Sequence, residues 1–175
     1  PAYGTWHLVS GAGAIADIHD PASAITGLDI GINVFSWTVY NGDCGFGPPT
    51  VDTVAIYVYD HSAPAANAGP DQDICGTGST VTLAGNAATF PGFGLWTALD
   101  GNPAIADAND PASTVTGLSI GDNRFLWTVN NGPCGTTSDT VLVRVFDATL
   151  PEPNAGPDQD LCSPAVTATS RWRPS

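Results

Sequence analysis

Four cysteines are the residues of this sequence best suited to covalent chemistry: Cys44, Cys75, Cys134 and Cys162. None belongs to a CxxC pair, so a zinc site is not expected, and their regular placement indicates disulfides formed in an oxidising compartment. Two pairings remain open. We favour Cys75 with Cys134 as a staple inside one unit, worth on the order of 4 kcal/mol, with Cys44 and Cys162 bonded to partners outside that unit. The alternative joins Cys44 to Cys75 and Cys134 to Cys162, between neighbouring units.

Acidic pairs mark the start of two similar segments. Asp71 and Asp73 occur in NAGPDQDIC, and Asp158 and Asp160 occur in NAGPDQDLC. Calcium binds through carboxylate oxygens, but it takes about six to eight of them, which is more than one pair supplies. We interpret these residues first as turn caps and second as weak calcium candidates at unit junctions. No other cofactor is expected.

Tryptophans recur at fixed positions, Trp6 and Trp37 being followed 90 residues later by Trp96 and Trp127. Apolar and polar residues alternate around them, which is typical of half-buried strands, so the rings are expected in the core between two sheets. A carbohydrate-binding platform would instead need aromatic rings exposed in a row. The better candidates for such exposure are Tyr3, Tyr40, Tyr57, Tyr59 and Phe93.

Catalytic constellations are not supported by the remaining residues. The three histidines do not recur at the repeat spacing, and no serine lies in a GxSxG context. Paired carboxylates for glycoside hydrolysis would be expected to break the repeat at their site. The sequence therefore predicts a protein that is not an enzyme.

The elements that must position these residues form a repeat. The run from 20 to 44, DPASAITGLDIGINVFSWTVYNGDC, recurs from 110 to 134 as DPASTVTGLSIGDNRFLWTVNNGPC, at a spacing of 90. Beyond a loop of different length the spacing falls to 87, so that Asp52 corresponds to Asp139. Short β-rich runs separated by turns predict about seven strands per unit in a two-sheet sandwich, and hence an all-β, tandem fold.

Three segments follow from this repeat. Residues 1–63 are expected to form a first unit without its two opening strands, residues 64–150 a complete unit, and residues 151–175 the opening strands of a third, with a divergent or truncated tail after Thr169. The chain is expected to be a piece of a longer protein. Alternatively, residues near 154–169 of one chain complete residues 1–63 of the next, which would polymerise copies head to tail by strand addition.

The charge balance limits the partners. Seventeen Asp and Glu residues face four Lys and Arg residues, for a formal net charge of −13. Such a surface repels nucleic acid and anionic lipid, and no apolar run approaches the roughly 20 residues of a membrane helix. Neither nucleic-acid binding nor membrane insertion is expected.

Several short motifs together carry a resemblance to a known family. AGPDQ at the start of a unit, then VTLAG, a WT strand, TGL, WTVNNGPC and DTV resemble the PKD-like, immunoglobulin-like repeats of very large secreted Bacteroidetes proteins, including gliding-motility and type IX secretion cargo proteins. The resemblance covers nearly the whole chain. It implies tandem immunoglobulin-like (PKD-like) sandwiches of about 87–90 residues and no catalytic residues to carry over.

The resemblance also implies a role outside the cell. A secreted, cell-surface stalk, adhesin or filament module is expected, with neighbouring repeats, copies of itself or surface glycans as partners. Thr53 and Thr140 lie in Asp-Thr-Val sequences that resemble the O-glycosylation acceptor of Bacteroidetes. The alternative function is that of a carbohydrate-binding accessory module of a secreted hydrolase.

Overall fold

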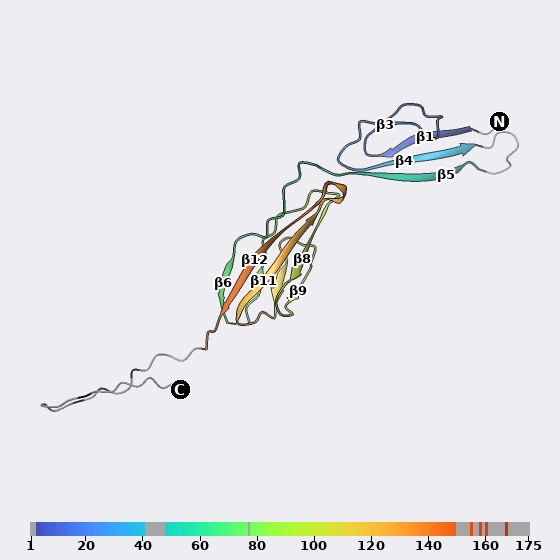
Figure 1. The fold of residues 1–175 in the computed structure, drawn as a ribbon. Coiled ribbons are helices and arrows are strands. Elements are labelled where there is room, and N and C mark those ends of the chain that lie inside the picture. Colours follow the sequence, from blue (N-terminus) through green and yellow to red (C-terminus); the bar gives the residue numbers. More distant parts are fainter. Residues whose placement is uncertain are drawn as a thin grey trace.

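The computed structural model describes residues 3–40, 48–76 and 78–149, together with the single residues 155, 158, 160 and 167. The described residues up to 149 form two β units that follow one another along a long axis (Figure 1). The described part of the chain contains strands and one 3-10 turn, η2 (Gly132–Cys134). None of its helices is long and apolar enough to cross a bilayer. The predicted all-β fold is confirmed.

The second unit is a two-sheet sandwich. Its larger sheet has the order β6-β12-β11-β8, and its smaller sheet has the order β7-β10-β9. Every pairing is antiparallel except that of β6 with β12, which is parallel. The bounds are β6 (Gln72–Cys75), β7 (Val81–Thr82), β8 (Phe93–Ala98), β9 (Ala104–Ile105), β10 (Thr114–Thr116), β11 (Gly121–Asn130) and β12 (Thr136–Phe146).

The alternating residues of these strands build the core of the second unit. Trp127 and Phe125 of β11 are 0% exposed, and they pack with apolar residues of both sheets. The inner face of β12 contributes Val141, Val143 and Val145. Period-2 alternation is therefore enough to predict which side of each long strand is buried.

The first unit repeats only part of this sandwich. One sheet has the order β1-β4-β5 and the other pairs β2 with β3. The bounds are β1 (Tyr3–Ser10), β2 (Ala14–Ile15), β3 (Ile25–Thr26), β4 (Gly31–Tyr40) and β5 (Thr50–Val58). Within the described residues the first unit has no counterpart of β6 or β7, so β5 and β3 are edge strands.

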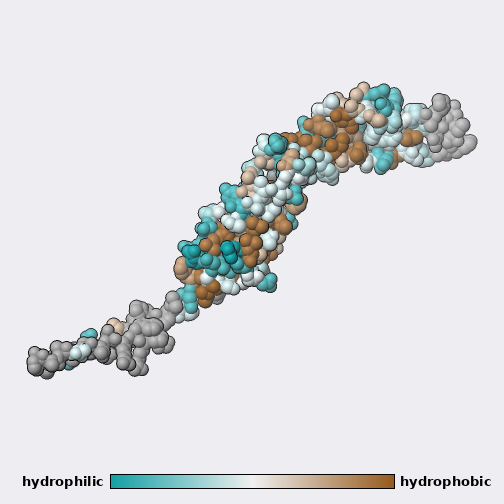
Figure 2. All heavy atoms as spheres, viewed as in Figure 1, coloured by the Kyte–Doolittle hydropathy of each residue, from teal (hydrophilic) through white to brown (hydrophobic). Residues whose placement is uncertain are grey.

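The missing strands leave the core of the first unit open. Val54 of β5 is 41% exposed, whereas its counterpart Val141 is 1% exposed. Ile25 of β3 is half-buried, whereas its counterpart Val115 is fully buried. In Figure 2 apolar residues gather on the visible face of the first unit. An unpaired edge strand with an exposed apolar face is a template for a further strand.

Candidate functional site

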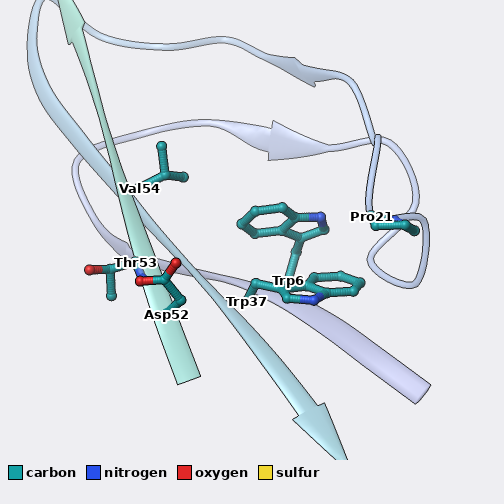
Figure 3. Close-up of a pocket in the computed structure, with 6 residues that line it drawn as sticks. All are labelled: Trp6, Pro21, Trp37, Asp52, Thr53 and Val54. Carbon is teal, nitrogen blue, oxygen red and sulfur yellow. The ribbon is translucent and has the colours of Figure 1, made fainter. Parts of the chain in front are cut away.

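A cleft in the first unit lies where the two missing strands would pack. It has a volume of about 200 Å³ and is lined by Trp6, Pro21, Trp37, Asp52, Thr53 and Val54. Figure 3 shows the two indole rings beside each other, with the three β5 residues along one side. The site thus combines two aromatic faces, one carboxylate and an open strand edge.

Strand register places the two rings together. Trp6 of β1 lies directly opposite Trp37 of β4, and their ring centroids are 4.9 Å apart. The indole N–H of Trp6 donates to the carbonyl of Asp20 at 3.1 Å. Gly4 leaves room for the Trp37 ring, because a Cβ atom there would collide with it. Both tryptophans remain half-buried.

The second unit shows the same constellation with the cleft filled. Trp96 and Trp127 have ring centroids 4.8 Å apart, but they are only 2% and 0% exposed. The segment that follows β7 covers them: the Trp127 indole N–H donates to the carbonyl of Asn86 at 3.1 Å. A Cβ atom on Gly85 would lie 3.0 Å from both rings, so this covering segment needs glycine at that position.

The carboxylate at this position accepts a different hydrogen bond in each unit. Asp139 accepts a hydrogen bond from the backbone N–H of Ala68 at 2.9 Å, which fixes the chain entering β6. Its counterpart Asp52 accepts one from the adjacent backbone N–H of Thr53 at 2.8 Å. Asp52 therefore stands where an incoming segment could be fixed by the same contact.

Two of the four acidic calcium candidates, Asp71 and Asp73, have protein partners. Asp71 accepts from the backbone N–H of Leu142 at 2.9 Å, and so ties the start of β6 to β12. Asp73 lies 3.9 Å from Arg144, while Asp158 and Asp160 are exposed. Among the residues that the structure describes, no group of three or more His, Cys, Asp or Glu side chains could hold a metal ion.

The favoured disulfide between Cys75 and Cys134 is wrong. Both cysteines are free and exposed. Cys75 pairs with Phe146 at the end of β12, whereas Cys134 precedes the start of the same strand. Ten residues of strand separate their positions by about 33 Å, far beyond the reach of a disulfide. Cys44 and Cys162, which enter the other pairing, lie outside the described residues.

The two units meet at the end of the second unit that carries Cys134. The side-chain amide of Asn131 donates to the carbonyl of Asp60 at 2.7 Å. Cys134 Sγ lies 4.0 Å from the carbonyl oxygen of Tyr59. Beside these contacts a cavity of about 260 Å³ runs between the linker at residues 61–65 and the turn at residues 131–137. Sequence reasoning did not predict this junction. The one signal that could have indicated it is the correspondence of Tyr59, at a spacing of 87, with Phe146 at the end of β12.

Two carboxylates whose pKa is lowered lie away from the cleft. The Arg124 guanidinium donates to both carboxylate oxygens of Asp100, at 2.7 and 3.0 Å, and this hydrogen bonding lowers the pKa of Asp100. The pKa of Asp60 is lowered by hydrogen bonds from the hydroxyl and the backbone N–H of Ser62. Neither carboxylate lines the cleft, where Asp52 is the charged side chain among the lining residues.

The remaining predicted site residues lie on the surface. Thr53 and Thr140 are both exposed, and Thr53 lines the cleft. Tyr3, Tyr57 and Phe93 are 54%, 53% and 53% exposed. Of these rings Tyr3 stacks on Tyr40 with centroids 4.9 Å apart. The structure thus places the predicted aromatic residues on more than one strand and in both units.

A curated relative is similar to most of this chain. The chain is 28% identical over 145 residues to the Dyslexia-associated protein KIAA0319-like protein of Mus musculus, an alignment that covers 77% of this chain and 14% of that protein. No family model matches the chain. The chain spans only a small part of this relative, so the relative's activity and partners are not carried over.

Several solved structures are also similar to this chain. The PKD domain from KIAA 1837 protein is 28% identical with a TM-score of 0.44, covering 52% of this chain and 94% of that domain. The tandem Ig repeats of Dlar are 16% identical with a TM-score of 0.36, covering 84% of both chains. Drosophila N-cadherin EC1-4 is 16% identical with a TM-score of 0.35, covering 85% of this chain and 41% of that one.

Proposed function

We propose that this chain is a non-catalytic structural and adhesive repeat module of a secreted, cell-surface stalk, adhesin or filament. The large Bacteroidetes surface proteins with gliding-motility or type IX secretion roles are the class in which we place it. Its partners are neighbouring repeats or copies of itself, which assemble head to tail. Assembly takes place by strand complementation at the open edge of the first unit.

The observation that carries this proposal is the difference between β5 and β12. These strands match at a spacing of 87, yet β12 is covered by β6 while β5 is an edge. Val54 is exposed, so it lacks the packing that its buried counterpart Val141 has. Burying such an apolar side chain contributes about 1.5–3 kcal/mol, so a strand that covers β5 would gain apolar burial as well as backbone hydrogen bonds.

Blocking the edge of β5 is expected to weaken assembly. The backbone N–H of Leu142 points from β12 towards Asp71, and its repeat counterpart is the N–H of Ala55, which faces the open edge. Ala55→Pro removes that donor, and proline is tolerated on edge strands. In size-exclusion chromatography with light scattering, we expect the mass of the wild-type particles to increase with protein concentration. We expect the variant to associate roughly tenfold more weakly.

The conservative variant Ala55→Ser keeps the N–H group and serves as the matched control. It is expected to assemble like the wild-type chain. A wild-type chain that stays monomeric at every concentration, or an Ala55→Pro chain that assembles unchanged, contradicts the proposal. Circular dichroism of all three chains separates loss of assembly from loss of folding.

Carbohydrate binding is the second candidate, because the cleft pairs two indole faces with a carboxylate. Sugar rings stack on such faces. In this case Trp6→Ala abolishes retention of the chain on glycan affinity gels. An unmodified chain that is not retained, or a Trp6→Ala chain that is retained equally, contradicts this second candidate.

A further inference from the structure

The linker between the two units is tied down at both of its ends. At its start the backbone N–H and the hydroxyl of Ser62 donate to the Asp60 carboxylate, at 2.8 and 2.7 Å. Beyond residues 61–65, the backbone N–H of Ala66 donates to the hydroxyl of Thr137 on β12 at 2.8 Å. The linker therefore runs between two fixed points.

The turn at the start of the linker is a local feature of each unit. At a spacing of 87, Asp60 corresponds to Asp147 and Ser62 corresponds to Thr149. Thr149 donates to the Asp147 carboxylate at the same distances, 2.8 Å from its backbone N–H and 2.7 Å from its hydroxyl. An Asp side chain bonded to the backbone two residues further on makes a turn that local sequence fixes. The backbone at Asp60 is thus shaped before the second unit contacts it.

The second unit reaches the end of the first unit through a short turn. The side-chain amide of Asn131 donates to the carbonyl of Asp60 at 2.7 Å. Gly132, at a φ of +54°, lies so close to the Tyr59 ring that a Cβ atom on it would be 2.5 Å from that ring. Among the described residues the two units share one other hydrogen-bond contact, from the thiol of Cys134 at 4.0 Å. The orientation of the units therefore depends on a small number of contacts.

The turn that carries Asn131 closes without the help of its side chain. The backbone N–H of Asn131 donates to the carbonyl of Gly135 at 2.8 Å, and the backbone N–H of Gly132 donates to the side-chain oxygen of Asn130 at 2.8 Å. The side-chain oxygen of Asn131 is buried and has no partner among the described residues, which costs free energy. The side chain of Asn131 thus serves the contact with the first unit and not the fold of the turn.

Small contacts between domains usually leave the domains free to move relative to each other, so a rigid junction needs a specific device. We infer that Asn131 is that device, a latch that holds the two units in one orientation. While its amide is bonded to Asp60 and the Tyr59 ring lies on Gly132, the units move as one body. When the bond is lost, the linker moves into the adjacent cavity of about 260 Å³, and the units pivot about Asp60.

The latch goes beyond the proposed function and is a property of a single chain. Its residues lie in the middle of the sequence and within the described part of the structure, so it does not depend on the assembly of copies. A closed latch transmits the direction of the first unit to the second. An open latch lets the chain bend at this junction.

Residual dipolar couplings of the full chain, measured by NMR in a weakly aligning medium at neutral pH, test the latch. They are recorded at concentrations at which light scattering shows single chains. We expect one alignment tensor to fit the amides of both units in the wild-type chain. Asn131→Asp has the same shape but replaces the amide donor with a carboxylate oxygen. In this variant we expect loss of the common tensor and a separate tensor for each unit.

Asn130→Asp is the matched control, because it introduces the same charge one residue away and keeps the oxygen that accepts from Gly132. We expect it to keep one common tensor. Tyr59→Ala tests the latch from the first unit, since it removes the ring that lies on Gly132 and leaves the sequence of the second unit unchanged. We expect this variant to lose the common tensor too. Amide chemical shifts of β4 and β11 show whether each unit stays folded.

Three results contradict the inference. Two tensors in the wild-type chain show that the junction is flexible as it stands. A common tensor in a folded Asn131→Asp chain shows that other contacts hold the units. Loss of the common tensor in Asn130→Asp as well shows that added charge, and not the lost donor, opens the junction. If chemical shifts change throughout β11 in Asn131→Asp, Tyr59→Ala decides, and a common tensor in that chain overturns the latch.

Discussion

Trp127→Ala is expected to destabilise the second unit by about 3–5 kcal/mol, which is the usual cost of removing a buried aromatic side chain. The ring is 0% exposed and is enclosed between Trp96, Gly85 and the core valines. Its indole N–H also donates to Asn86. The substitution therefore creates a large cavity and leaves the part-buried carbonyl of Asn86 without its indole partner.

The repeat supplies a matched control for this change. Trp37→Ala removes the same side chain from the same strand position of the first unit, where the ring is half-buried and one face meets the open cleft. We expect the free energy of unfolding of the first unit to fall by roughly half as much, since less buried apolar area is removed. Segment-resolved hydrogen exchange of β11 and β4 in urea measures both losses in the full chain. Equal losses at low protein concentration would show that the cleft of the first unit is already filled in solution.

Gly94→Ala has the second-largest expected effect, about 1–3 kcal/mol, because overpacking of a well-filled core costs that much. A Cβ atom on Gly94 would collide with the six-membered ring of Trp127. That ring has little room to move away, since Gly85 lies so close to it that a Cβ atom built there would be 3.0 Å from the ring. The second unit must therefore absorb the collision by shifting β8 against β11.

Gly4→Ala is the matched control in the first unit. Its Cβ atom would meet the ring of Trp37 in the same way, but that ring can turn into the cleft. A loss below about 1 kcal/mol is expected, measured by the same hydrogen-exchange experiment. A Gly4→Ala loss as large as that of Gly94→Ala would contradict the idea that the cleft gives the ring freedom to move.

Filling the cleft should remove this asymmetry. A peptide of residues 64–86 that occupies the cleft of the first unit would enclose Trp37 as Asn86 and Gly85 enclose Trp127. The stability differences between matched variants thus report whether an opening strand pair is bound. They link the packing energetics directly to the proposed assembly.

Much of the fold could be predicted because its determinants are local or repeated. Alternation around Trp127 identifies an inward strand face, and the two spacings of 90 and 87 match strands between units without any knowledge of their pairing. The same spacings also predict a first unit without its two opening strands. Such patterns depend only on the period of a strand and on the order of elements along the chain.

The pairing of Cys75 and Cys134 was predicted wrongly for a physical reason. Equal numbers of cysteines per repeat say nothing about which end of a sandwich each one occupies. That depends on the parallel pairing of β6 with β12, a contact between segments about 70 residues apart that no local pattern specifies. The same long-range pairing decides that Cys134 faces Tyr59 of the preceding unit.

The sequence by itself thus determined the class of fold, the repeat and the residues of each strand that face inward, because alternation and turn chemistry act over a few neighbours. Only the tertiary structure decided that Trp6 and Trp37 border an open cleft while Trp96 and Trp127 are enclosed. Identical sequence patterns have different surroundings in the two units, since enclosure depends on which distant segment packs above them. The open edge of β5 and the thiol at the junction are consequences of that packing.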